Sequence, residues 1–334
     1  MTHSAIVATE VGGSSHGTLV QLTDADLPDG DVTVAVRYSS LNYKDGLAVS
    51  GQGRIVRSFP MVCGIDLAGT VEESASADWH PGDEVIVTGW GLSETHPGGY
   101  TQRQRVRSPW LVALPDGLTL LQSMAIGTAG LTAMLCVLAL EHNDLRPGGE
   151  GDDHSEVLVT GAAGGVGSVA VALLAALGYP VAASTGRPET HGYLTSLGAT
   201  TIVDRRELAT PSGRPLDRER WAGAIDVVGG ETLAAVIRQT RYRGTVAACG
   251  LTGGSDLPTT VLPFILRGVS LMGVDSVSCP ADLRTDAWHR LARDLPSALL
   301  DSLTTVEPLH RVPELAGQIV AGRTRGRVVI DVNA

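Results

Sequence analysis

The sequence predicts a two-domain α/β protein, in which a β-rich part is followed by a doubly wound parallel sheet. At 334 residues the chain is long enough for two hydrophobic cores. Residues 1–123 read as short strands separated by turns, and from residue 157 onward β-type and helical patterns alternate. Strands that alternate with helices form a parallel sheet, because each helix returns the chain to the same edge.

In the first part, partial alternation and β-rich runs predict strands, and a Pro-Gly-Asp turn precedes the last of them. A helical, apolar pattern follows, and then a charged, glycine-containing segment that we interpret as an exposed loop. The predicted strands are 32–40, 69–74 and 83–89, the helix is 124–140 and the loop is 141–156.

In the second part, the first strand leads directly into a glycine-rich turn and a long helix. The predicted strands are 157–160, 180–185, 201–203, 224–228, 244–249 and 269–274. The predicted helices are 166–178, 188–198 and 231–241, and a helix over 313–322 and a strand over 327–332 end the chain. We found no internal repeat.

Composition excludes several functional classes. A net charge of −11 argues against general nucleic-acid binding, which depends on neutralising phosphates. No apolar run is seen to reach the roughly 18–20 residues that span a bilayer, the nearest being 166–183, and the N-terminus has no signal pattern. The scattered Cys63, Cys136, Cys249 and Cys279 predict neither disulfides nor structural zinc. We therefore expect a cytoplasmic protein that does not bind membranes.

The glycine cluster of "VTGAAGGVGS" (159–168) predicts a phosphate-binding turn. Two types of such turn, the P-loop and the Rossmann turn, can be compared directly with its residues. A nucleoside-triphosphate P-loop is excluded because the cluster has no lysine. In a Rossmann turn Ala162, Gly164 and Gly167 take the three glycine positions, with alanine replacing the first. The backbone of Ala163, Gly164, Gly165, Val166 and Gly167 would then face a pyrophosphate at the start of the helix.

A short-chain dehydrogenase turn is matched literally by Thr160, Gly161, Gly165 and Gly167. That family needs a Tyr-x-x-x-Lys pair, but Lys44 is the single lysine of the chain and a serine, Ser40, lies four residues before it. The short-chain family is therefore excluded. A tight turn without any ligand stays open as the plain alternative.

The end of the second strand of the Rossmann unit indicates the cofactor. NAD-binding turns place a carboxylate about 20 residues after the glycines, to bind the ribose 2′-OH. Here that place is taken by Ser184, Thr185, Gly186 and Arg187. An arginine fork binds a 2′-phosphate well, so we predict NADP(H). A solvated helix-start arginine is the alternative interpretation.

No catalytic metal is predicted. Zinc alcohol dehydrogenases share a two-domain plan, but the segment "MVCGIDLAGTVEE" offers Cys63 and Asp66 without a neighbouring histidine, and His80 and His96 stand alone. Without a Lewis acid, reducing a polarised double bond is easier than oxidising an alcohol.

The chain resembles the zinc-free, quinone-oxidoreductase-like branch of the medium-chain dehydrogenase/reductase superfamily, and within it the acrylyl-CoA reductase (NADPH) family. The matching stretches are 39–72 with "LNYKD", 127–135, 159–179, 221–230, 247–277 and 326–333. Cys63 in a proline position and a long 147–156 loop depart from the pattern. The resemblance implies a GroES-like substrate domain (1–123 and 297–334), a Rossmann domain (124–296), an active site in the cleft and a homodimer through 269–275.

The resemblance also implies a reaction: NADPH reduces acryloyl-CoA to propionyl-CoA, with hydride going to the β-carbon and a proton to the α-carbon. Tyr43 would contact cofactor and substrate and donate the proton, Asn42 would bind the ribose or the thioester oxygen, and Asp45 would orient them. The further cofactor contacts it implies are Thr128, Leu251, Ile265, Ser276 and Arg327. Core packing is the alternative for Leu251 and Ile265, and surface solvation for Ser276 and Arg327.

Two questions stay open at this stage. The acceptor is an enoyl-CoA or, alternatively, a quinone or another enone, and an NADPH-binding protein without turnover is the non-enzyme alternative. CoA needs a basic patch, for which Arg54 with Arg57, or Arg323 with Arg325, are candidates. The alternating Arg103, Arg105 and Arg107 read as a solvated strand edge.

Overall fold

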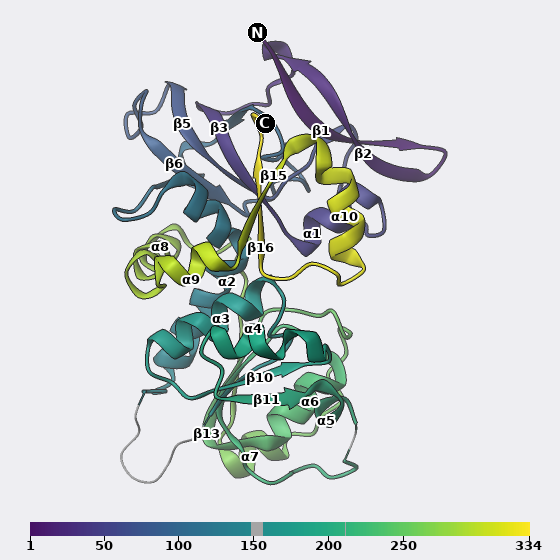
Figure 1. Ribbon diagram of the computed structural model, residues 1–334, viewed down its shortest axis with the longest axis vertical. Helices are drawn as coiled ribbons and strands as arrows, with labels where there is room; N and C mark the ends of the chain where they lie inside the picture. The colour runs from purple at the N-terminus through teal and green to yellow at the C-terminus, as the bar shows by residue number, and fades with distance from the viewer. Residues whose placement is uncertain (148–155, 211) are drawn as a thin grey trace. The chain divides into compact units, whose positions relative to one another are not determined.

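The computed structural model describes residues 1–147, 156–210 and 212–334, and these residues form two compact units (Figure 1). The first unit contains Met1–Thr128, Ser276–Ala292 and Leu300–Ala334, and the second contains Ala129–Asp275 and Arg293–Leu299. Half of the loop predicted over 141–156, residues 148–155, lies outside the described residues, and so does most of the long 147–156 part.

The first unit is built on two sheets. The larger sheet has the strand order β15-β16-β3-β5-β6-β8, with β7 also paired to β3, and the smaller has the order β2-β1-β4. Strand β16 pairs antiparallel with β3, so the C-terminal end of the chain completes the sheet begun near the N-terminus. The strands are β1 (Thr2–Val11), β2 (Ser14–Thr23), β3 (Val32–Leu41), β4 (Met61–Val62), β5 (Asp66–Ser74), β6 (Glu84–Thr88), β7 (Arg103–Val106), β8 (Val112–Ala113), β15 (Thr304–Pro308) and β16 (Arg327–Asp331).

Helix α1 (Tyr43–Ser50) carries most of the "LNYKD" segment and begins directly after β3. The extended Asn42 caps it, and its backbone N–H donates to Oδ2 of Asp45 at 2.9 Å. The helix ends at Gly51, whose φ of +68° suits glycine. Helix α10 (Val312–Val320) packs against α1 so closely that a β-carbon at Gly46 would lie 2.9 Å from Cγ2 of Val320. The C-terminal return therefore holds the start of α1 in place.

The second unit is the predicted doubly wound sheet. Its strand order is β11-β10-β9-β12-β13-β14, and every ladder is parallel, which confirms the fold class inferred from the alternating pattern. The strands are β9 (Val157–Val159), β10 (Val181–Thr185), β11 (Thr201–Asp204), β12 (Trp221–Asp226), β13 (Thr240–Ala248) and β14 (Ser270–Gly273). The helices are α3 (Gly165–Ala176), α4 (His191–Ser196), α5 (Arg205–Ala209), α6 (Gly230–Gln239) and α7 (Leu262–Arg267), with η3 (Pro188–Thr190) before α4.

Helix α2 (Leu120–His142) corrects the expectation that no apolar run has membrane-spanning length. Its 23 residues include a window of mean hydropathy 1.9, which is long and apolar enough by length and composition. That window is 83% buried, and Gly127 interrupts the helix with φ 52° and ψ −161°. A buried core helix passes the same test of length and composition. The burial of this window therefore indicates that α2 is apolar because it packs in the protein core.

Residues 276–292 belong to the first unit, whereas the sequence analysis placed them in the nucleotide-binding domain. The physical reason is Arg284 of α8 (Ala281–Asp294), whose side chain is buried. Its Nη1 donates to the carbonyl oxygen of Thr88 at 2.7 Å, and its Nη2 donates to that of Ser276 at 3.1 Å. A buried guanidinium needs such acceptors, and the end of β6 supplies one of them, the carbonyl oxygen of Thr88. The remaining helices are η1 (Asp24–Asp26), η2 (Ser108–Trp110), α9 (Ser297–Ser302) and η4 (Leu309–Arg311).

Candidate functional site

The first unit contains a buried polar network centred on Asp66, the first residue of β5. Its Oδ2 accepts from Nδ2 of Asn42 at 2.8 Å, from the backbone N–H of Thr128 at 2.9 Å and from Oγ of Ser40. Its Oδ1 accepts from Oγ1 of Thr128. One carboxylate thus joins β3, the start of α1 and the middle of α2. Sequence reasoning noted Asp66 only as a poor metal ligand, although a carboxylate within the apolar run "CGIDLAG" was a signal.

Arg327 adds a positively charged side chain to this network. It is 2% exposed, its Nε donates to the carbonyl oxygen of Ala125 at 2.7 Å, and its Nη2 donates to Oδ1 of Asn42 at 3.3 Å. We expected this arginine to approach a cofactor phosphate, and the solvation alternative does not fit its burial. In the structure it binds the side-chain amide of Asn42. The Oδ1 of that amide accepts from Arg327, and its Nδ2 donates to Asp66.

Asp45 is the second buried carboxyl group of the network. Its Oδ1 accepts from the backbone N–H of Ile65 at 2.9 Å, and its Oδ2 accepts from Nδ2 of Asn42 at 3.1 Å. Burial, and then the nearby charge of Asp66, raise the pKa of Asp45 from 3.8 to about 7. The protonation state of the network therefore changes near neutral pH.

This raised pKa makes stability depend on pH in a defined direction. A carboxyl whose pKa is higher in the folded state favours folding below pH 4, and this contribution is lost as the pH rises through 7. We expect the wild type to lose about 2.5 kcal/mol of unfolding free energy relative to Asp45→Asn between pH 5 and pH 8. Urea unfolding of both proteins at several pH values measures this difference. Parallel pH profiles would contradict it.

Tyr43 differs from its neighbours in exposure. As the first residue of α1 it is 44% exposed, whereas Asn42 and Asp45 are buried. The next residue, Lys44, forms an ion pair with Glu94. The network thus fixes the backbone on either side of Tyr43 and leaves its phenol accessible.

The second unit places the glycine turn between β9 and α3, as predicted. Gly161 has φ +56°, and a β-carbon at Gly167 would lie 2.6 Å from Cα of Ala162, so both positions require glycine. Oγ1 of Thr160 donates to Oδ1 of Asp226 at 2.7 Å and fixes the turn to β12.

The turn leaves backbone donors at the start of α3. The first intrahelical bond runs from the N–H of Ser168 to the carbonyl oxygen of Gly164, so the N–H groups of 165–167 precede any helical acceptor. The N–H of Gly164 itself bonds to the carbonyl oxygen of Gly161. A β-carbon at Gly164 would meet nothing but that oxygen, at 3.3 Å, so the space outside the turn is open. These observations fit a pyrophosphate.

Arg187 lies against the same turn. Its Nη2 donates to the carbonyl oxygen of Ala163 at 3.3 Å, and its N–H donates to Oγ1 of Thr185 at 3.2 Å. Ser184 and Thr185 are buried, and Oγ1 of Thr185 also lies 3.1 Å from Oγ1 of Thr190. The hydroxyl of Thr185 therefore shapes the loop after β10, while Gly186 is exposed.

The other expected cofactor contacts fall into two groups. Leu251 and Ile265 are 67% and 69% exposed, so the alternative of core packing is wrong for both. Thr128 and Ser276 belong to the first unit, where Thr128 binds Asp66 and the carbonyl oxygen of Ser276 accepts from Arg284.

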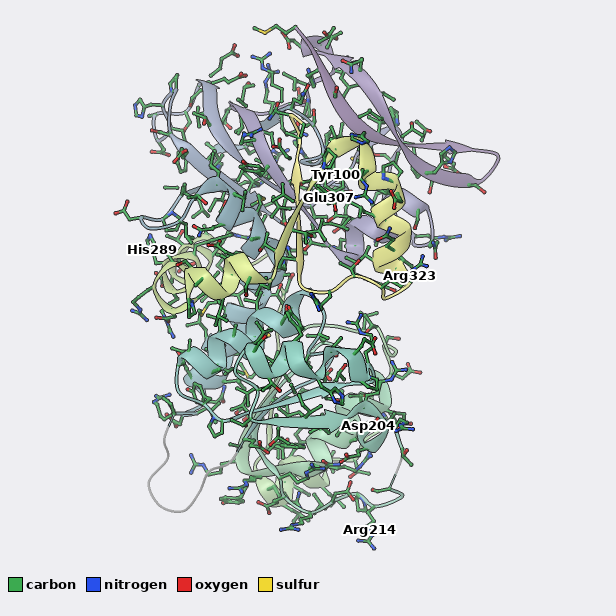
Figure 2. All side chains as sticks on the ribbon, in the orientation of Figure 1. Tyr100, Asp204, Arg214, His289, Glu307 and Arg323 are labelled. Carbon is green, nitrogen blue, oxygen red and sulfur yellow. The ribbon has the colours of Figure 1, made fainter. Side chains whose placement is uncertain are left out.

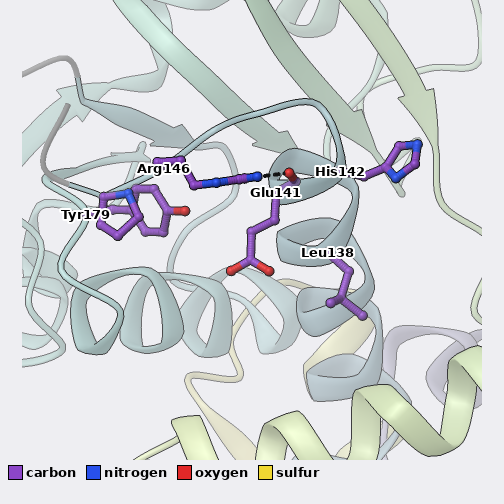
Figure 3. Close-up of a pocket in the computed structure, with 6 residues that line it drawn as sticks. Leu138, Glu141, His142, Arg146 and Tyr179 are labelled. Atoms are coloured by element: carbon purple, nitrogen blue, oxygen red, sulfur yellow. Dashed lines mark hydrogen bonds between the residues drawn. The ribbon is translucent and has the colours of Figure 1, made fainter. Parts of the chain in front are cut away.

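A separate hollow lies elsewhere in the second unit, with a volume of about 500 Å³ (Figure 3). It is lined by Leu138, Glu141, His142, Arg146, Pro147 and Tyr179. Figure 3 shows the guanidinium of Arg146 turned back to the carbonyl oxygen of Glu141, a hydrogen bond of 2.6 Å. No predicted site residue lines it.

Comparison with known proteins adds two family matches. Residues 28–116 match the alcohol dehydrogenase GroES-like domain, and residues 165–293 match the zinc-binding dehydrogenase family. The chain is 55% identical over 325 residues to acrylyl-CoA reductase AcuI of Ruegeria pomeroyi, covering 97% of each protein. The chain belongs to the acrylyl-CoA reductase AcuI family. The predicted resemblance and the GroES-like and Rossmann fold classes are thereby confirmed.

Solved structures of relatives have the same fold as this chain. The YhdH oxidoreductase of Salmonella enterica in complex with NADP is 52% identical, with a TM-score of 0.95 over 99% of this chain and 100% of that one. YhfP of Bacillus subtilis with NAD bound is 42% identical, with a TM-score of 0.95 over 99% of this chain and 100% of that one. The first of these relatives thus holds NADP and the second holds NAD.

Zinc, which one family description names, does not fit this chain's described residues. Within 1–147, 156–210 and 212–334 no group of three or more histidine, cysteine, aspartate or glutamate side chains comes together. Asp66 and Asp45 are occupied by N–H and O–H donors instead. Zinc-free chemistry stays a prediction, for which metal analysis of the purified protein is the direct test.

Proposed function

We propose that this protein catalyses the NADPH-dependent reduction of acryloyl-CoA to propionyl-CoA. The observation that carries the proposal is the 55% identity, over 97% of both chains, to an acrylyl-CoA reductase. In the balanced reaction, acryloyl-CoA, NADPH and one proton give propionyl-CoA and NADP⁺. A C–H bond forms at the β-carbon and another at the α-carbon, while the carbon–carbon double bond becomes single.

NADPH, when bound, supplies the hydride, and the second unit offers groups for its phosphates. The N–H groups of 165–167 face the pyrophosphate at the positive end of α3. Arg187 binds the 2′-phosphate from the loop after β10. Leu251 and Ile265 offer exposed apolar surface for the nicotinamide ring.

In the first unit, Tyr43 is the proposed proton donor to the α-carbon, and it is the exposed member of its segment. Asn42 and Asp45, which the sequence analysis treated as catalytic, act as positioning residues, because their polar atoms are engaged with Asp66, Arg327 and Ile65. They fix the helix start from which Tyr43 projects.

Replacing Tyr43 by phenylalanine should lower kcat about tenfold if its hydroxyl delivers the proton, while KM for NADPH changes little. Single-turnover NADPH oxidation measures the chemical step directly. Tyr242→Phe is the matched control, since Tyr242 is an exposed tyrosine of the second unit outside the proposed site. An unchanged chemical step in Tyr43→Phe would assign the proton to water.

Replacing Arg187 by alanine should raise KM for NADPH about tenfold and leave KM for NADH nearly unchanged, because a charge-assisted hydrogen bond to phosphate is lost. Initial rates with each cofactor at saturating acryloyl-CoA give both constants. NADH serves as the internal control. Equal effects on both cofactors would exclude the 2′-phosphate role.

A quinone or general enone reductase is the second candidate, favoured by the 44% identity to the putative quinone oxidoreductase YhfP of Bacillus subtilis, over 92% of both proteins. NADPH consumption with acryloyl-CoA, crotonyl-CoA and 1,4-benzoquinone separates the two. We expect the highest kcat/KM for acryloyl-CoA. A value no higher than that for the quinone favours the second candidate, and NADPH binding without turnover favours a non-enzymatic role.

The CoA nucleotide needs basic residues. Arg54, Arg57, Arg323 and Arg325 are exposed and remain the proposed candidates. Arg103, by contrast, is held by Asp24, Glu72 and Glu73, so it is not available to a ligand.

A homodimer is proposed through β14, the edge strand of the parallel sheet. The edge carries Leu271 and Met272, both half-buried, and the preceding helix α7 exposes Leu266. An open edge with apolar neighbours favours pairing with a second copy. Light scattering after gel filtration should give twice the 34.7 kDa chain mass. A cytoplasmic location is proposed because all four cysteines are free.

A further inference from the structure

The carboxyl end of β11 lies beside the loop that follows β10. The two strands pair in parallel, with Thr185 opposite Asp204. Figure 1 shows strands β10 and β11 side by side. Gly186 and Arg205 are therefore the next residues at the same edge of the sheet. Ligands of doubly wound sheets bind at this edge.

Arg205 lies across the backbone of Gly186. A β-carbon at Gly186 would overlap Nε and Cδ of Arg205 and would lie 2.9 Å from Cγ. Gly186 is not among the glycines with positive φ, so here glycine provides space rather than an unusual conformation. The absence of a side chain at position 186 lets the arginine reach the loop that carries Arg187.

The local charges leave Arg205 available. The carboxylate of Asp204 is taken by Arg206, which donates from Nε to Oδ2 at 3.0 Å and from its backbone N–H to Oδ1 at 2.9 Å. These bonds lower the pKa of Asp204 to about 2. Arg205 is exposed, and its side chain forms no hydrogen bond or ion pair within the described part of the chain.

We propose that Arg205 is a second determinant of NADPH specificity, binding the 2′-phosphate together with Arg187. This inference rests on the proposed use of NADPH. Two guanidinium forks, one from each of two adjacent loops, match a phosphate that carries up to two negative charges. The sequence pattern alone pointed to Arg187, because Arg205 reaches the loop only through the pairing of β10 with β11.

Isothermal titration with 2′,5′-ADP and 5′-AMP tests the proposal on the full chain without turnover. Arg205→Ala should weaken 2′,5′-ADP about tenfold and change 5′-AMP less than about twofold, because only the former carries the 2′-phosphate. Arg205→Lys should retain part of the difference. The matched control is Arg214→Ala, an exposed arginine of the same unit that Figure 2 shows apart from Asp204.

The outcomes separate the two proposals. A wild-type protein that binds 2′,5′-ADP no tighter than 5′-AMP overturns the proposed NADPH preference and the role of Arg205 with it. A wild-type preference that persists undiminished in Arg205→Ala overturns only the role of Arg205. An equal loss in Arg214→Ala shows a general charge effect and also overturns that role.

Discussion

Replacing Asp66 by alanine is expected to destabilise the first unit by about 3–5 kcal/mol, the cost of breaking a buried charged network. The change removes the acceptor shared by Ser40, Asn42 and Thr128. It also leaves the buried guanidinium of Arg327 with less negative charge nearby. The melting temperature should fall by about 10 °C. Activity should fall as well, because the segment that presents Tyr43 loses its anchor.

Calorimetry and NADPH consumption at a temperature where the variant is folded measure the two effects separately. Asp66→Asn keeps one acceptor oxygen and should lie between alanine and wild type. Asp78→Ala, which removes an exposed aspartate of the same unit, is the control and should change stability by less than about 0.5 kcal/mol. A melting temperature for Asp66→Ala within 2 °C of wild type would contradict this account, because it would correspond to a loss of unfolding free energy of only about 1 kcal/mol or less.

Gly127→Ala is expected to have a comparable effect, about 4 kcal/mol, from sterics and backbone strain. Gly127 has φ 52° and ψ −161°, which is nearly restricted to glycine. A β-carbon there would lie 2.7 Å from Oδ2 of Asp66, 2.8 Å from Oγ of Ser40 and 2.9 Å from Nη2 of Arg327. The methyl group would therefore push into the network from α2.

The matched control is Gly317→Ala in the interior of α10, where no atom lies within 4 Å of the added carbon. Helix propensity makes that change neutral or stabilising by up to about 1 kcal/mol. Denaturant unfolding of the three proteins provides the comparison. If Gly127→Ala were as stable as Gly317→Ala, the kink of α2 would have no structural importance.

Local signals explain why the second unit was predicted well. The apolar run of β9, the glycines of the turn and the pattern of α3 are contiguous, so periodicity and turn chemistry suffice to recognise them. Helix α2 was predicted over 124–140, which already spans the kink at Gly127, and the structure extends it to Leu120–His142 by a few residues at each end. The hydrogen bond from Arg284 to the carbonyl oxygen of Thr88 could not be predicted, because the two residues lie far apart in the sequence.

The sequence by itself determined the fold class, the family and the type of cofactor turn, since these reside in short runs of residues. The tertiary structure alone decided which polar groups meet. It joined Asn42, Asp66 and Arg327, whose positions are far apart along the chain, into one buried network. It also placed Arg205 over Gly186. The physical reason is that strand pairing brings distant residues within hydrogen-bonding reach, and no local pattern in a single sequence records which strands become neighbours.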